Sequence, residues 1–143
     1  MLIVKKFGGS SVADKERIFN VASRCLEDYH KGHDVVVVLS AMGKTTDHLL
    51  AQAKDINPAA SKREIDMLLT TGEQVSAALM CMAFQSLGAQ AISLNAWQVG
   101  MHTTSVYGSA KLKRIDTERL RRELEMRKIV VVTRSWRVPR GGG

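Results

Sequence analysis

Residues 34–40 have the sequence DVVVVLS, and this stretch decides the fold class. Four consecutive valines do not alternate with polar residues, so they suit a strand that is covered on both faces. Strands of that kind are typical of parallel sheets with helices packed on either side. The stretch therefore predicts a buried parallel strand, and the neighbouring segments are interpreted outward from it.

The segments before this strand predict the first β–α–β unit. Residues 2–7 (LIVKKF) predict another buried strand. Residues 14–31 predict a helix that ends at Lys31-Gly32, because a cation and a glycine are typical of helix C-termini. Its apolar positions have helical spacing: Ile18, Val21, Ala22, Cys25 and Leu26. The two parallel strands are expected to be joined by a right-handed connection.

The rest of the chain continues the alternation. Helices are predicted over residues 47–54, 61–87 and 116–127, the last as a charged surface helix N-capped by Asp116 or Thr117. Strands are predicted over residues 89–94 and 128–133, and residues 96–115 predict a hairpin laid over an edge. Strands alternating with helices predict an α/β fold with a mainly parallel sheet.

The composition predicts one soluble globular domain. The 143 residues are 45% hydrophobic and 24% charged, which suits a single core. No apolar run approaches the ~20 residues of a membrane helix. Cys25 and Cys81 lie in apolar helical patterns and are expected to be reduced core thiols, so a cytoplasmic protein is expected. His30 and His33 lie near a helix end and are not expected to bind a metal.

The net charge of +7 belongs to the last quarter of the chain. Residues 1–110 are balanced, whereas residues 111–143 hold 11 basic and 4 acidic side chains. The basic segment is interpreted as a solvated helical face with ion pairs such as Glu118–Arg122. Because aromatic side chains that would stack on bases are missing nearby, a nucleic-acid partner is not favoured.

A first polar cluster follows the first predicted strand, over residues 6–11 (KFGGSS). Ligands of open α/β sheets bind beyond the carboxyl ends of the strands. Two glycines let the backbone approach an anion, and Lys6 would neutralise a transferring phosphoryl group. The lysine precedes the glycines, so this is not a Walker A loop. On this segment alone, a turn with solvated lysines is an equally good interpretation.

Two further clusters add small hydroxyl residues and one carboxylate. The small hydroxyl residues within residues 40–47 (SAMGKTTD) suit the binding of a substrate carboxylate. The alternative is that Thr45 or Thr46 only caps the next helix. Residues 70–73 (TTGE) have the spacing of a capping box, and the alternative is that Glu73 grips an ammonium group. Gly72 inside a strong helical pattern indicates a close approach of another segment.

In this order, the clusters resemble a known family. The segments KKFGGSSVADKERI (5–18), VVVVLSAMGKTTD (35–47), MLLTTGEQVSAALM (67–80) and GMHTTSVYGSAK (100–111) resemble the amino-acid kinase family, and within it the aspartate kinases. The likeness extends to about residue 133. It implies a three-layer αβα sandwich, incomplete here, in which residues 1–133 are the N-terminal, amino-acid-binding half of a kinase domain.

The resemblance implies ATP-dependent phosphorylation of the side-chain carboxylate of L-aspartate to 4-phospho-L-aspartate, the first step of lysine, threonine and methionine synthesis. Carried over by motif, Lys6 would be catalytic and stabilise the transferring phosphoryl group. The residues that would line the phosphate path are Gly8, Gly9 and Ser10. Those that would hold aspartate are Ser40, Thr46 and Glu73, with Glu73 near the ammonium group of aspartate. Mg²⁺ would arrive with ATP rather than on ligands of the chain, and a homo-oligomer is expected.

Residues 134–143 depart from the family pattern. Where relatives continue into a glycine-rich loop that supplies an arginine and nucleotide contacts, this chain has RSWRVPRGGG. We therefore expect a disordered tail and a truncated or frame-shifted chain with little activity by itself. The alternative is a non-enzymatic module that binds aspartate or assembles with itself, because a shortened parallel sheet leaves an open edge.

Overall fold

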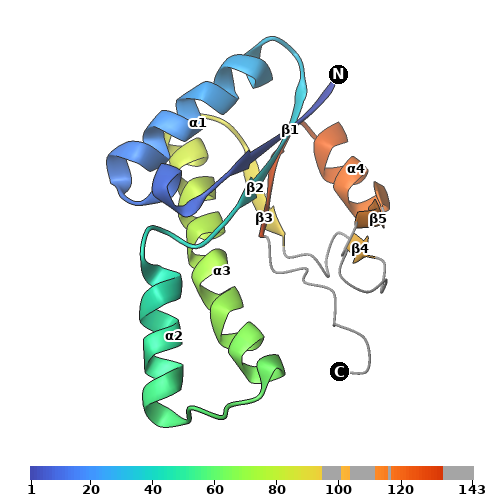
Figure 1. The fold of residues 1–143 in the computed structure, drawn as a ribbon. Coiled ribbons are helices and arrows are strands. Elements are labelled where there is room, and N and C mark those ends of the chain that lie inside the picture. The colour runs from blue at the N-terminus through green and yellow to red at the C-terminus, as the bar shows by residue number, and fades with distance from the viewer. Residues whose placement is uncertain (95–100, 104–111, 116, 134–143) are drawn as a thin grey trace.

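The computed structural model describes residues 1–94, 101–103, 112–115 and 117–133. Its centre is a four-stranded parallel sheet with the order β1–β2–β6–β3 (Figure 1). The strands are β1 (Leu2–Phe7), β2 (Asp34–Leu39), β6 (Ile129–Thr133) and β3 (Ala91–Leu94). The predicted parallel sheet is confirmed.

The two middle strands are buried along nearly their whole length. From Val35 to Leu39 no residue of β2 is more than 8% exposed, and all five residues of β6 are buried. Their register pairs Val36 with Val130 and Val38 with Val132. The valine run is therefore a strand covered on both faces, as the sequence predicts.

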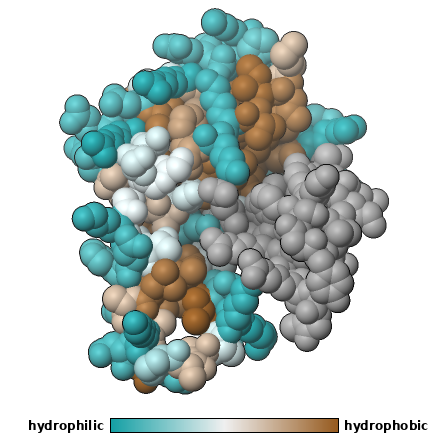
Figure 2. Space-filling model, in the orientation of Figure 1, coloured by the Kyte–Doolittle hydropathy of each residue, from teal (hydrophilic) through white to brown (hydrophobic). Residues whose placement is uncertain are grey.

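Strand β1 is an edge strand, and the prediction that it is buried is wrong. Its residues alternate between exposed and half-buried. Ile3 and Phe7 belong to the half-buried set, whereas Leu2 and Val4 are 52% and 59% exposed. Figure 2 shows hydrophobic surface over this strand. The apolar composition of residues 2–4 does not distinguish a central strand from an edge strand, because the difference depends on which elements pack beside it.

Helices cover both faces of the sheet and form three layers (Figure 1). Helices α1 (Lys15–His30) and α3 (Lys62–Ser86) lie on one face, where they share a hydrophobic cluster with Val35, Val37 and Leu39 of β2. Helix α4 (Thr117–Glu125) lies on the other face, where Leu120 and Leu124 pack with Val36 and the even-numbered valines of β6. The αβα arrangement is confirmed.

Helix α1 forms as its sequence predicts. The Asp14 carboxylate accepts a hydrogen bond from the Arg17 amide at 2.9 Å and caps the first turn. Gly32, after the last turn, has φ of +93°, a conformation that glycine adopts without steric cost. The five predicted apolar positions are all buried.

Helices α2 (Thr45–Ile56) and α3 pack against each other. By length and composition α3 is apolar enough to cross a membrane, whereas the sequence predicted no apolar run of that length. Its buried residues include Ala77, Met80 and Phe84, which belong to the main core. A core helix therefore accounts for the same apolar pattern.

Two short strands outside the main sheet form the predicted hairpin pair. Strand β4 (Met101–Thr103) pairs antiparallel with β5 (Leu112–Ile115). The predicted placement of the hairpin over a sheet edge involves residues 104–111, which lie outside the described part of the chain, as does the proposed cap Asp116.

Both cysteines are buried free thiols in the main core. Burial raises the pKa of Cys25 to about 11 and that of Cys81 to about 12. Both side chains are therefore neutral at physiological pH, as expected for core residues that are not nucleophiles.

Arg127 joins α1 to the turn before β6, at the end of the sheet opposite the polar clusters. Its guanidinium donates hydrogen bonds to the carbonyl oxygens of Tyr29 at 2.8 Å and His33 at 3.1 Å, and lies 4.2 Å from the centre of the Tyr29 ring. The Tyr29 hydroxyl donates to the Arg127 carbonyl at 2.8 Å. These contacts compensate for the left-handed backbone of Arg127, whose φ is 58°.

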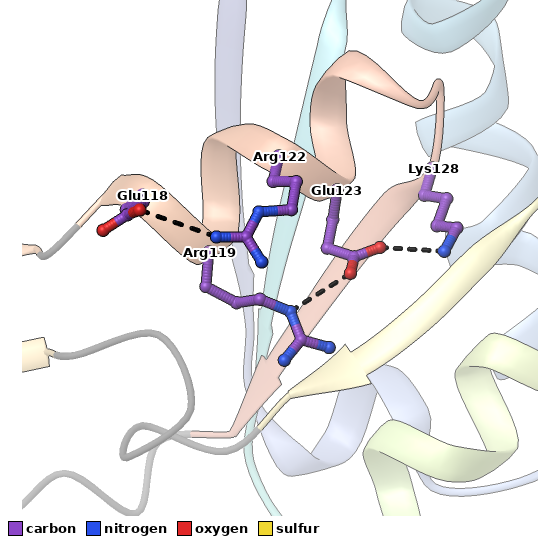
Figure 3. A network of polar contacts seen from close by, with 5 residues as sticks. All are labelled: Glu118, Arg119, Arg122, Glu123 and Lys128. Carbon is purple, nitrogen blue, oxygen red and sulfur yellow. Dashed lines mark hydrogen bonds and ion pairs between the residues drawn. The ribbon is translucent and has the colours of Figure 1, made fainter.

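Helix α4 carries an ion-pair network (Figure 3). The carboxylate of Glu123, only 5% exposed, is 2.8 Å from Lys128 Nζ and 3.1 Å from Arg119 Nε. The predicted pair of Glu118 and Arg122 is confirmed at 3.6 Å. Glu118 and Arg122 lie on the solvated face that the sequence predicts, whereas Leu120 and Leu124 on the other face cover the sheet, which the sequence did not predict.

We predict that acid weakens this network. The hydrogen bond from Lys128, with smaller help from Arg119, lowers the pKa of Glu123 below its ordinary value of 4.5. A lowered pKa in the folded state means that the ion pairs stabilise the fold fully above pH 4.5 and that this stabilisation is lost as the pH falls further. Urea unfolding of the wild type between pH 7 and pH 3 measures the loss.

The control is Glu123→Gln, which removes the charge and keeps the shape. At pH 7 it should lower the free energy of unfolding by about 1.5 kcal/mol, the lower end for hydrogen bonds to charged groups, because Lys128 and Arg119 stay partly solvated. Below pH 4.5, the free energy of unfolding of Glu123→Gln should fall less than that of the wild type. Equal pH dependence of the two proteins would contradict the assignment.

Candidate functional site at the carboxyl ends of β1 and β2

The two lysines at the end of β1 are placed on opposite sides of the strand. Lys5 Nζ lies 2.6 Å from Asp28 Oδ2 of α1, and the hydrogen bond that Lys5 donates to that carboxylate raises the pKa of Lys5. Lys6 is exposed and, within the described residues, makes no ion pair. Side chains alternate along a strand, so the two lysines point to opposite sides. Because Asp28 occupies Lys5, Lys6 is the one of the two that is available to an anion beyond the sheet.

The loop after β1 lies against the loop after β2. Lys6 is in register with Val38 and Phe7 with Leu39, so Gly8 and Ser40 leave the sheet side by side. The Gly43 amide donates a hydrogen bond to the Gly9 carbonyl at 2.9 Å. The polar residues of the first two clusters therefore meet at the same edge, as parallel pairing predicts.

Gly9 is required where the two loops touch. A Cβ atom at Gly9 would lie 2.6 Å from the carbonyl oxygen of Ala41, closer than atoms approach without a backbone shift. Gly8 precedes it with extended backbone and has nothing within 4 Å of the same position. Gly9 begins the short helix η1 (Gly9–Val12), which carries Ser10, an exposed residue, toward α1.

The segment after β2 turns sharply into α2. Ser40 is half-buried, Ala41 is buried and Gly43 has φ of +48°. Helix α2 starts at Thr45, and its N-cap residue Lys44 makes no side-chain cap hydrogen bond. The interpretation of Thr45 or Thr46 as the cap is therefore wrong, and Thr46 lies half-buried in the first turn of α2.

The third cluster lies inside α3, within the helix predicted over residues 61–87, so the capping-box interpretation is wrong. The hydroxyls of Thr70 and Thr71 donate to the carbonyls of Met67 and Leu68, at 2.7 and 2.6 Å, as happens inside a continuous helix. Glu73 is half-buried, and its Oε2 is shielded from solvent.

Gly72 brings this turn of α3 against the loop after β2. A Cβ there would lie 3.1 Å from both Ala41 Cβ and Thr45 Cγ2. Glycine costs about 1 kcal/mol against alanine inside a helix, so the close approach predicted from sequence is confirmed as the reason for it. Residues 41–45 are thus held between Gly9 and Gly72. The contacts of Ala41 and Thr45 with Gly72 were not predicted, because contacts between small residues leave no motif in the sequence.

The fold and this site define a family. The family model described as the amino acid kinase family matches residues 1–142, so the chain belongs to the amino acid kinase family. Among curated proteins, the chain is 54% identical over 131 residues to an aspartokinase from Bacillus sp. (strain MGA3). These residues are 92% of this chain and 32% of that relative, so the chain spans about a third of the length of such relatives.

Solved aspartokinases share the fold. The aspartate kinase from Synechocystis matches 92% of this chain and 21% of its own, with a TM-score of 0.79 and 45% sequence identity. Aspartokinase III from E. coli, solved in complex with aspartate and ADP, covers 93% of this chain and 40% of its own at a TM-score of 0.75. At 22% identity, this second likeness concerns the fold alone.

The contact between Gly9 and the Ala41 carbonyl predicts that alanine substitutions at Gly9 and Gly8 have different effects on stability. Gly9→Ala should lower the free energy of unfolding by about 1–3 kcal/mol, because its Cβ forces the loop of Ala41 to move. Gly8→Ala is the matched control and should change stability by less than about 0.5 kcal/mol. Chemical denaturation measures both. Similar losses for the two variants would contradict the contact.

Proposed function

We propose that this chain supplies the aspartate-binding and phosphoryl-facing side of an aspartate kinase, which transfers the γ-phosphoryl group of ATP to the side-chain carboxylate of L-aspartate. The product would be 4-phospho-L-aspartate, at the entry to lysine, threonine and methionine synthesis. The observation that carries this proposal is an exposed Lys6 that no described residue pairs with, beside two joined loops, in a chain 54% identical to an aspartokinase.

The chemistry needs positioning and neutralisation of charge. A carboxylate oxygen of aspartate attacks the γ-phosphorus, a new P–O bond forms, and the bond to the β–γ bridging oxygen breaks as ADP leaves. Lys6 would stabilise the negative charge that develops on the transferring group. The open space at Gly8 and the exposed Ser10 beside it suit the path of the phosphates. No covalent intermediate is required, which agrees with the neutral core thiols.

Ser40, Thr46 and Glu73 would hold aspartate. The hydroxyls are half-buried on either side of the segment that Gly9 and Gly72 clamp, and Glu73 follows Gly72 directly. A half-buried carboxylate suits the ammonium group of an amino acid, whereas hydroxyl groups suit its carboxylate. Aspartate would thus be fixed at both ends, with its side-chain carboxylate directed toward Lys6.

The nucleotide is proposed to bring Mg²⁺ with it as MgATP. Nothing in the described part of the chain groups three or more potential metal-ligating side chains, so no residue is assigned to the metal. Because the chain spans about a third of the length of its curated relatives, we expect aspartate binding with little or no turnover by the chain alone.

Calorimetry with variants tests these roles. Glu73→Gln should weaken aspartate binding at least about tenfold, since one charged interaction of ~1.5 kcal/mol is lost. Lys6→Met should leave aspartate affinity nearly unchanged and abolish any phosphoryl transfer in a hydroxamate assay. Lys54→Met, an exposed lysine of α2, is the matched control and should change neither. Failure of the wild-type chain to bind aspartate, or unchanged binding in Glu73→Gln, would contradict the proposal.

A second candidate function is self-assembly through β1. Within the described residues, one side of β1 has no strand partner. The exposed Leu2 and Val4 add apolar surface there. Free backbone groups and apolar side chains on one edge favour pairing with another strand. A homo-oligomer, expected for this chain, would be explained by that edge.

Sedimentation velocity tests the edge. Wild-type chain should associate as its concentration rises, and Val4→Lys should shift it toward monomer, because a charge at an exposed edge position opposes strand pairing. Ile56→Lys, at an 86% exposed apolar residue of α2, is the control and should associate like wild type. A monomeric wild type, or the same behaviour in both variants, would exclude β1 as the contact.

A further inference from the structure

The loop that would hold aspartate is positioned by a helix that lies behind it. Ala41 and Thr45 both touch the place where a Gly72 side chain would be, at 3.1 Å each. A third neighbour, Leu49 Cδ1 of α2, lies 3.5 Å from the same point. Gly72 therefore determines how closely α3 approaches the start of α2 and the loop before it.

The same loop is joined to the phosphate-facing side through backbone atoms. The Gly43 amide donates to the Gly9 carbonyl, and the Ala41 carbonyl lies against the Gly9 Cα hydrogens. A displacement of residues 41–45 would therefore be transmitted to the turn that follows Lys6. The two atoms nearest to the Gly72 Cβ position belong to the short side chains of Ala41 and Thr45, which have few rotatable bonds to absorb such a displacement.

We propose that Gly72 is a positioning residue for the kinase site: it sets Ser40 and Thr46 relative to Glu73 and, through Gly43 and Gly9, relative to Lys6. This inference rests on the proposed function for its substrate, aspartate, but its geometric part does not. A methyl group at residue 72 forces its neighbours to move by a few tenths of an ångström. Such a shift is enough to misalign groups that must contact one small substrate.

The test places Gly72→Ala in two backgrounds. In the wild type, the new methyl meets Ala41 Cβ and Thr45 Cγ2; in the Ala41→Gly/Thr45→Ser background, both contacting atoms are absent. Gln74→Ala, at an exposed position of α3 two residues away, is the matched control for adding alanine to the helix. Three quantities are measured for each protein: aspartate affinity by calorimetry, amide resonances by NMR, and the melting temperature.

In the wild-type background, Gly72→Ala should shift the amide resonances of residues 9–11 and 41–46 and weaken aspartate binding about tenfold. The melting temperature should hold or rise, because alanine favours the helix. In the relieved background, the same substitution should change aspartate affinity less than twofold. Gln74→Ala should leave affinity and the loop resonances unchanged.

The possible failures are distinguishable. Unshifted loop resonances in Gly72→Ala, or the same loss of affinity in both backgrounds, would overturn the positioning role even if the wild type binds aspartate. A wild-type chain that binds no aspartate would overturn the proposed function and with it the link to that substrate. The resonances of the two Gly72→Ala proteins would then still decide whether Gly72 sets the position of both loops.

Discussion

The burial of β2 and β6 on both faces is the constraint on which the rest of the structure depends. Their side chains are almost entirely apolar, so water must be excluded from both sides of the sheet. Helices α1 and α3 do this on one face and α4 on the other. Because parallel strands need crossover connections, the same helices that cover the sheet also bring every strand out at the same edge.

That edge concentrates the polar residues that the core excludes. The turns after β1 and β2 are joined by a backbone hydrogen bond and by the close contact at Gly9, while α3 approaches from behind at Gly72. A site of this kind is built on the backbone rather than on long side chains. Its groups are therefore positioned by rigid elements, which suits phosphoryl transfer, where most of the catalysis lies in alignment and charge.

Among the described residues, some cationic side chains are held in structural contacts, whereas Lys6 is available to bind an anion. Lys5, Arg119 and Lys128 are held by carboxylates, and Arg127 is held by carbonyl oxygens and the Tyr29 ring. These pairs hold helices to the sheet on both faces, away from the loops after β1 and β2. Lys6, one residue from Lys5, lies on the other side of the strand, is exposed and directly precedes the loop after β1. The alternation of a β-strand thus gives two adjacent lysines different roles.

The sequence by itself determined the strand and helix order, the parallel sheet, the core face of α1 and the edge at which the first two clusters meet, because periodicity and parallel topology are local or nearly local properties. It could not decide whether TTGE forms a capping box, assign β1 to the sheet edge or show that α4 covers a face. Only the tertiary structure decided these, since TxxE spacing, an apolar run and a charged helix each suit more than one environment. Which one applies depends on contacts between residues far apart in the chain, as between Gly72 and Ala41.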